Sequence, residues 1–327
     1  MKINTLFRVT LLSAAIALAG CSNEPDMSQQ DIEYISHVDQ ARFFQRQGEL
    51  KASTIEARSA IELQPQRVAP YFVIINNLLT AGDAVNAERQ LEQLLKNADI
   101  NELSQSEQNQ AALIRAESNI LQGETEDALA ALDDIESPEP DLARDAANLR
   151  GLARLAAGQL DEAKAAYQQA VDNHSSNVEA MVGLSRIAAA QGSESTSSEW
   201  LAKAEQADPE HESLWLWKAE LAQSQQRWQD AEQAYVKALE TIGQYDVMTY
   251  RKYQTISSLV TVLREQGKSA EAFVYEEILA KSGPGTIKSN LEAASAAYND
   301  GDLDGAARYL QEVLNQAPSH EQSALML

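Results

Sequence analysis

The stretch that decides the fold is Gly158–Asn173, GQLDEAKAAYQQAVDN, in which a glycine is followed by small residues and one aromatic residue at fixed intervals. Ala163 comes five residues after the glycine, and Tyr167 and Ala170 follow; Gly151 stands seven residues before it. A glycine at this place is typical of a turn that ends a first helix. Small residues let two helices approach closely, and a large ring fills the space between neighbouring units.

The same spacing recurs along the chain with a period of about 34 residues. Two insertions of seven residues, around NADINELSQSE and GQYDVMT, interrupt the period without destroying it. A repeated unit of this length predicts an all-α solenoid, in which each unit buries its apolar side on the next. Eight units cover the chain to His320, and they begin at Tyr34, Val68, Asn109, Arg144, Val178, Glu212, Tyr253 and Ile287.

This pattern of Gly, Gly, Ala, Tyr and Ala resembles the tetratricopeptide repeat, a helix–turn–helix unit of 34 residues. The resemblance implies an α-solenoid wound as a right-handed superhelix, with a concave inner face lined by the first helix of each unit. We expect each insertion to lengthen a helix or a loop and to mark a change of curvature. The resemblance also gives candidate partner contacts on the inner face, namely Asn148, Arg186, Glu220, Arg264 and Asn299.

The candidate groove residues do not match those of repeats that bind the C-terminal carboxylate of a peptide. The candidates lack the lysine and asparagine set of the carboxylate clamp in chaperone-binding repeats, so we do not expect capture of a peptide C-terminus. Solvated polar residues without a ligand are the alternative interpretation.

The N-terminus carries the signature of a secretory signal. Lys2 and Arg8 precede the apolar run Val9–Ala19, which is too short to span a bilayer. The run ends in LAGC, with the chain's single cysteine at Cys21. LAGC resembles the lipobox of bacterial lipoproteins, which implies cleavage between Gly20 and Cys21 and lipid attachment at Cys21. An ordinary signal peptide with an incidental cysteine is the alternative.

The segments around the repeats follow from these assignments. Residues 1–20 are the predicted signal peptide, and residues 21–31 are polar and unpatterned, as expected of a tether. The repeats occupy residues 32–320. Ser22, in place of aspartate, favours the outer membrane facing the periplasm in lipoproteins of the enterobacterial type. Residues 321–327 fit the start of an incomplete ninth unit, so we expect the chain to be the N-terminal part of a longer repeat protein.

The composition excludes several classes of partner. The chain has 26 Lys and Arg against 49 Asp and Glu, a net charge of −23, and loss of residues 1–20 removes two bases and no acid. Such a charge argues against nucleic acid and against adhesion to anionic lipid. We expect attachment to the membrane through the lipid at Cys21 alone, and protein partners in an envelope complex.

Patterns that imitate catalytic or ligand sites are weak. Asp300–Gly305 resembles a calcium loop, but the twelfth residue is Gln311 where an EF-hand needs glutamate. Gly267–Ser269 lacks the earlier glycine of a phosphate loop. The four histidines have no metal-ligand spacing, and no nucleophile–base–acid set is recognised. We therefore expect no metal, no cofactor and no enzymatic activity.

The four tryptophans are clustered within one stretch of the chain. They are Trp200, Trp215, Trp217 and Trp228. Packing within and between units is the preferred interpretation, and an exposed patch that grips a peptide or a sugar is the alternative.

The first two units resemble the start of the long repeat lipoproteins found with exosortase and PEP-CTERM sorting systems, although those proteins are longer than 327 residues. The match lies on Ala41, Gly48, Ile55, Glu56, Ala60, Ile61 and Pro65, and then on Leu78, Leu79, Gly82, Ala87 and Leu91. The resemblance implies an assembly scaffold beside exopolysaccharide export and surface-protein sorting. The alternatives are a pilotin-like or Bam-like accessory lipoprotein of an outer-membrane pore, and a saccharide-binding module or enzyme.

Overall fold

The computed structural model describes residues 28–97, 103–316, 323 and 327, and throughout these residues the regular structure is helical. The predicted signal peptide, Cys21, most of the tether and most of the predicted ninth unit lie outside the described residues. The helices are α1 Gln29–Arg46, α2 Leu50–Leu63, α3 Ala69–Ala81, α4 Ala84–Asn97, α5 Gln105–Gln122, α6 Thr125–Asp133, α7 Pro140–Ala156, α8 Leu160–Asn173, α9 Val178–Ala190, α10 Glu194–Ala207, α11 Glu212–Ser224, α12 Trp228–Thr241, α13 Tyr250–Glu265, α14 Ser269–Ala280, α15 Gly283–Asn299 and α16 Leu303–Gln316.

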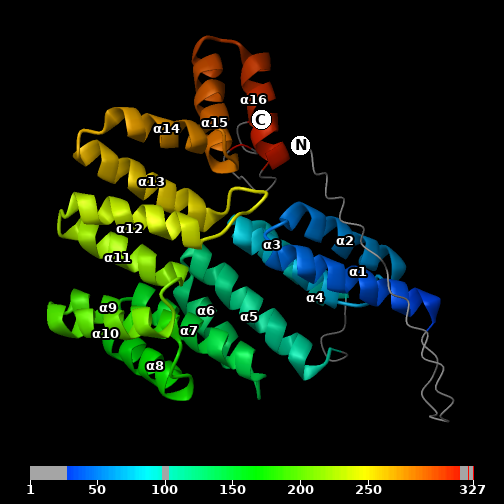
Figure 1. Cartoon of the computed structure of the whole chain (residues 1–327). Coiled ribbons are helices and arrows are strands. Elements are labelled where there is room, and N and C mark those ends of the chain that lie inside the picture. The colour runs from blue at the N-terminus through cyan, green and yellow to red at the C-terminus, as the bar shows by residue number, and fades with distance from the viewer. Residues whose placement is uncertain (1–27, 98–102, 317–322, 324–326) are drawn as a thin grey trace, which may run out of the picture.

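The sixteen helices of the described residues form eight antiparallel pairs, one for each predicted unit, and the pairs stack into a curved solenoid (Figure 1). The first helices of successive units contact one another from α1 through α11. The predicted all-α solenoid of eight repeats is confirmed. None of the helices in the described part of the chain is long and apolar enough to cross a membrane.

The first helix starts earlier than the sequence pattern predicts. Ser28 caps α1, because its hydroxyl oxygen accepts a hydrogen bond from the backbone N–H of Asp31 at 3.1 Å. Residues 29–31, which the pattern assigned to the tether, are therefore helical. A serine at this position satisfies one of the free N–H groups at the start of a helix.

The fourth unit shows how small residues and the aromatic ring work together. The Tyr167 ring of α8 is almost fully buried between α7 and α9. A Cβ atom added at Gly151 or Gly183 would lie 2.5 or 2.4 Å from that ring. Only glycine leaves room for the ring at this distance, so these two glycines set the spacing between neighbouring units.

The turns inside the units also follow the sequence pattern. A glycine with positive φ ends or follows the first helix in seven of the eight units, for example Gly158 at 74°. This left-handed conformation suits glycine because it has no Cβ atom. The exception is Gln226 between α11 and α12, which adopts φ 57°.

The second insertion forms a loop, residues 242–249, that connects α12 to α13 and reaches the first unit; we call it the clasp. Figure 1 shows this yellow connection lying beside α2 and α3. The Asp246 carboxylate accepts backbone hydrogen bonds from Leu50 at 2.9 Å and Lys51 at 3.0 Å. Its own N–H donates to the Gly48 carbonyl at 3.1 Å. The clasp therefore caps the N-terminus of α2 from a position almost 200 residues later.

Two glycines of the first units make room for the clasp and for the start of α13. A Cβ atom at Gly48 would lie 2.2 Å from the Gln244 carbonyl oxygen, and one at Gly82 would lie 2.6 Å from the Tyr250 Cβ. Helix α13 also contacts α3. The second insertion thus lies where the solenoid curves back onto its first two units.

Candidate partner groove

A groove of about 1210 Å³ runs along the concave side of the third to seventh units. Its lining comes mainly from the first helices α5, α7, α9, α11 and α13, with the rings of Tyr167 and Tyr235 contributed by the second helices α8 and α12. The apolar side chains of the lining are Leu113, Leu149, Leu152, Leu155, Val182 and Leu216. The groove therefore offers both apolar surface and polar side chains, as surfaces that bind proteins do.

One wall of the groove carries an ion pair between neighbouring first helices. The Arg186 guanidinium of α9 lies 2.7 Å from the Glu220 carboxylate of α11. It also lies over the Trp217 ring, 4.6 Å from the ring centroid. The Trp217 indole N–H donates to the Ser185 hydroxyl at 2.8 Å. These contacts hold the arginine in place and satisfy its charge within the chain.

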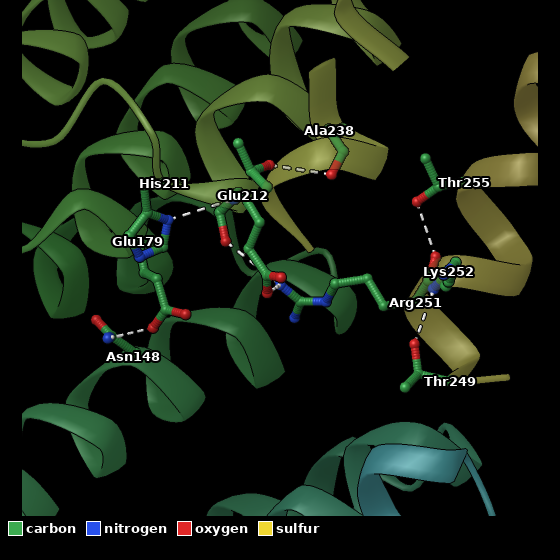
Figure 2. A network of polar contacts seen from close by, with 11 residues as sticks. Asn148, Glu179, His211, Glu212, Ala238, Thr249, Arg251, Lys252 and Thr255 are labelled. Atoms are coloured by element: carbon green, nitrogen blue, oxygen red, sulfur yellow. Dashed lines mark hydrogen bonds and ion pairs between the residues drawn. The ribbon is translucent and has the colours of Figure 1, made fainter. Parts of the chain in front are cut away.

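A second ion pair spans a longer separation along the chain. Arg251 at the start of α13 pairs with Glu212 at the start of α11 (Figure 2). The Thr249 hydroxyl caps α13 by accepting from the Lys252 N–H at 3.2 Å, and the Thr255 hydroxyl donates to the Arg251 carbonyl at 2.7 Å. The pair thus connects two helices that the clasp separates in sequence.

The groove also carries three acidic side chains outside these two ion pairs. Glu117 of α5, Asp145 of α7 and Glu179 of α9 all line it. The Asn148 amide donates to the Glu179 carboxylate at 2.6 Å (Figure 2), and its carbonyl oxygen accepts from the Asn177 amide at 2.8 Å. This chain of amides fixes the direction of the Glu179 side chain.

Burial and neighbouring negative charges disfavour the ionised forms of Glu117 and Asp145. Burial raises the pKa of Glu117, the negative charges of Asp145 and Glu179 raise it further, and Arg251 opposes the shift. Burial likewise raises the pKa of Asp145, although Arg144 pairs with that carboxylate at 3.1 Å. Burial in such surroundings favours the neutral form of a carboxyl group over its ionised form.

Three of the five predicted partner contacts line the groove, and two do not. Asn148, Arg186 and Glu220 are part of its lining. Arg264 lies near the C-terminal end of α13 and pairs with Glu276 of α14, with its Nε 2.7 Å from the carboxylate oxygen. Asn299 is exposed at the last position of α15. The residues of α13 that line the groove lie in its first nine positions, so Arg264 is too far along the helix.

The sequence contained a signal for residues that the prediction missed. Arg186 and Glu220 are the ninth residues of their predicted units, and the ninth residues of the third and fourth units are Glu117 and Leu152. Both line the groove. Glu179 and Arg251 have no such signal, because each lies at the start of its helix and reaches the groove through the stacking of the units.

The tryptophans pack within and between units. Trp215 and Trp228 contact the core of the sixth and seventh units, and Trp200 and Trp217 contact that of the fifth. Cations of the chain cover three of the ring faces: Arg186 lies over Trp217, Lys203 over Trp200 and Lys218 over Trp215. The packing interpretation accounts for these positions.

The segments that resemble a calcium loop, Asp300–Gly305, and a phosphate loop, Gly267–Ser269, have structural roles. The Asp302 carboxylate accepts from the Gly305 N–H at 2.9 Å at the start of α16, which is a helix cap. Gly267 is the turn residue of the seventh unit. Among the described residues, no group of histidine, cysteine, aspartate and glutamate side chains could hold a metal ion.

Comparison with known proteins agrees with this architecture. A tetratricopeptide-repeat family model matches residues 72–143 and 148–212, and a second one matches residues 289–320. The chain is similar to a solved structure of the APC/C hetero-tetramer Cut9–Hcn1, with 13% identity and a TM-score of 0.51 over 89% of this chain. It spans only about half of that chain, 54%. No curated protein matches the sequence significantly.

Two further solved structures are similar over part of the chain. MamA from Desulfovibrio magneticus RS-1 has 17% identity and a TM-score of 0.42, and the match covers 54% of this chain and 96% of that one. PilW, a type IV pilus biogenesis factor, has 17% identity and a TM-score of 0.42 over 64% of this chain and 90% of that one. With its matched repeats and its stacked helix pairs, the chain belongs to the tetratricopeptide-repeat proteins.

Proposed function

We propose that this protein is a lipid-anchored scaffold of the bacterial envelope that holds a segment of a partner protein in its concave groove. The observation that carries the proposal is the groove itself, which extends across five units and presents apolar side chains between charged ones. A repeat solenoid uses such an extended concave surface to bind proteins.

The place of action is proposed from the sequence. The lipobox-like LAGC supports cleavage before Cys21 and lipid attachment there, on the periplasmic side of the outer membrane. The resemblance of the first two units to exosortase-associated repeat lipoproteins supports a role in exopolysaccharide export and PEP-CTERM protein sorting. In this role the lipid holds the solenoid at the membrane, and the groove recruits a component of the machinery.

Site-specific photo-crosslinking in the native cells tests the groove. A photoreactive residue at Leu152, which is 41% exposed and lines the groove, should capture a protein that mass spectrometry can identify. The matched control is Val236 on α12, which is 38% exposed and outside the groove lining. Equal capture from both positions, or none from Leu152, would contradict the groove assignment. A product from another envelope machine would contradict only the pathway.

Metabolic labelling tests the anchor separately. Radioactive palmitate should label the wild-type protein and leave Cys21→Ser unlabelled, because the cysteine sulfur is the predicted site of attachment. The processed wild type should fractionate with membranes, since several acyl chains bind a bilayer firmly. Equal labelling of both proteins would show that the lipobox interpretation is wrong.

A further inference from the structure

The charges that line the groove are not evenly balanced. Both arginines of the lining are neutralised by glutamates of the chain, Arg186 by Glu220 and Arg251 by Glu212. These pairs lie on α9, α11 and α13. The lining also contains the carboxylates of Glu117 on α5, Asp145 on α7 and Glu179 on α9, so its acidic residues outnumber its basic residues by four to two.

Two of these three carboxylates form no direct ion pair with any described residue. Asp145 pairs with Arg144, which also contacts Asp141 at 3.0 Å. Glu179 accepts only the neutral amide of Asn148. Glu117 makes no hydrogen bond or ion pair with any described residue. Burial raises the pKa of the Glu117 carboxyl although the positive charge of Arg251 opposes the shift, so a further cation beside Glu117 would favour its ionised form.

Apolar side chains share helix faces with two of the groove carboxylates, Glu117 and Asp145. Leu113 precedes Glu117 by one helical turn on α5, and Leu149 and Leu152 follow Asp145 by one and two turns on α7. Residues at these spacings share a helix face. The combination of leucine side chains and carboxylates suits a long cationic side chain, whose methylene groups pack on apolar surface while its head meets the charge.

We propose that the segment held in the groove is cationic, with a lysine or arginine side chain that lies on Leu113 and Leu149 and reaches Glu117 and Glu179. This inference rests on the proposed function, because it specifies the chemistry of the segment that the groove binds. Glu117 and Glu179 are then the residues that recognise the cation, and Asn148 positions Glu179. The strong negative charge of the whole chain, −23, brings cationic partners closer from a distance without selecting a site.

The test uses the full chain with Cys21→Ser and a phage library of random dodecapeptides as the probe. Selected peptides should share a lysine or arginine, and their synthetic fluorescent forms should bind in an anisotropy titration. The double variant Glu117→Gln and Glu179→Gln should weaken binding at least about tenfold, the size expected for loss of a charge-assisted hydrogen bond. Replacing the peptide's cationic residue by norleucine should weaken binding to the wild type similarly and should have little further effect on the variant.

A matched control separates specific recognition from general attraction. The double variant Glu62→Gln and Glu92→Gln removes the same charge from exposed positions on α2 and α4, outside the groove lining, and should change affinity less than about twofold. Equal losses in both double variants would overturn the proposal, and so would selected peptides that bind without a cation. A neutral peptide that crosslinks to position 152 would overturn this inference while leaving the proposed groove function intact.

Folding of the groove variant is checked independently. Its melting temperature at pH 7 should stay close to that of the wild type, because Glu117→Gln removes a carboxylate that burial disfavours and Glu179 lies at an exposed position. If this variant were unfolded, the norleucine peptides on the wild-type chain would still decide the question.

Discussion

Gln226 occupies the turn position at which the other seven repeats have a glycine. It takes the left-handed φ of 57° in the turn between α11 and α12. For a residue with a Cβ atom this conformation costs about 1–2 kcal/mol. The side chain is exposed and has no hydrogen bond that would compensate. The strain is therefore local and removable.

Replacement of Gln226 by glycine should stabilise the protein by about 1 kcal/mol, since the left-handed strain exceeds the entropy cost of glycine. Urea unfolding of the two proteins measures the difference. The reciprocal control is Gly158→Gln, at φ 74° and with open space around its Cβ direction, which should destabilise by a similar amount. A neutral or destabilising Gln226→Gly would contradict the assignment of strain to this turn.

Residue positions were predicted best where the chemistry is local. The turn glycines and the buried Tyr167 follow from short spacings in the sequence, and the structure places them as expected. The repeat resemblance predicts that Arg264 and Asn299 lie on the inner face, but it does not give the residues at which their helices begin. Helix α13 begins three residues before the predicted unit, and Arg264 lies far beyond the residues that reach the groove.

At the scale of elements, the cap of α2 comes from outside its own unit. Glu49 at the N-cap position makes no side-chain hydrogen bond to the helix. The Asp246 carboxylate supplies two acceptors instead, and its negative charge lies at the positive end of the helix dipole. The sequence predicted eight helix pairs from their period, and an insertion after the sixth pair that lengthens a helix or a loop. It could not predict this cap, because no local spacing relates Asp246 to Leu50.

Two glycine-to-alanine variants measure the contact between the clasp and the first unit. Gly48 and Gly123 have similar φ, 78° and 83°, but only Gly48 faces the clasp, with its Cβ direction 2.2 Å from the Gln244 carbonyl oxygen. Both substitutions introduce left-handed strain, and Gly48→Ala should cost about 1–3 kcal/mol more because of the overlap. Chemical denaturation gives both free energies of unfolding. Equal losses would mean that the clasp does not lie against the first unit in solution.

At the scale of the whole molecule, the clasp joins two distant units, which a linear solenoid does not do. In a linear solenoid each unit contacts only its neighbours, so curvature is the sum of small rotations between units. Here the loop before the seventh unit is bonded to the first unit, and α13 contacts α3. The groove runs along the units between these bonded parts of the chain, so we expect it to keep one width. A groove of fixed shape binds a segment without the cost of ordering the scaffold first.

This fixed curvature predicts a distance change across the molecule when the clasp is broken. Spin labels at Arg58→Cys on α2 and Glu271→Cys on α14, in the Cys21→Ser background, should give a narrow distance distribution by pulsed electron paramagnetic resonance. Asp246→Ala removes both charge-assisted bonds to α2, each of a kind that contributes about 1.5–3 kcal/mol, so the distribution should broaden and move to longer distances.

The control pair for this measurement is Arg58→Cys with Gln93→Cys on α4, whose separation does not depend on the clasp. That distance should stay the same in the Asp246→Ala protein, which also shows that the first two units remain folded. An unchanged distribution for the α2–α14 pair would mean that stacking between successive units sets the curvature without the clasp. A solenoid closed by its own insertion should instead open at this one contact, and the groove should widen with it.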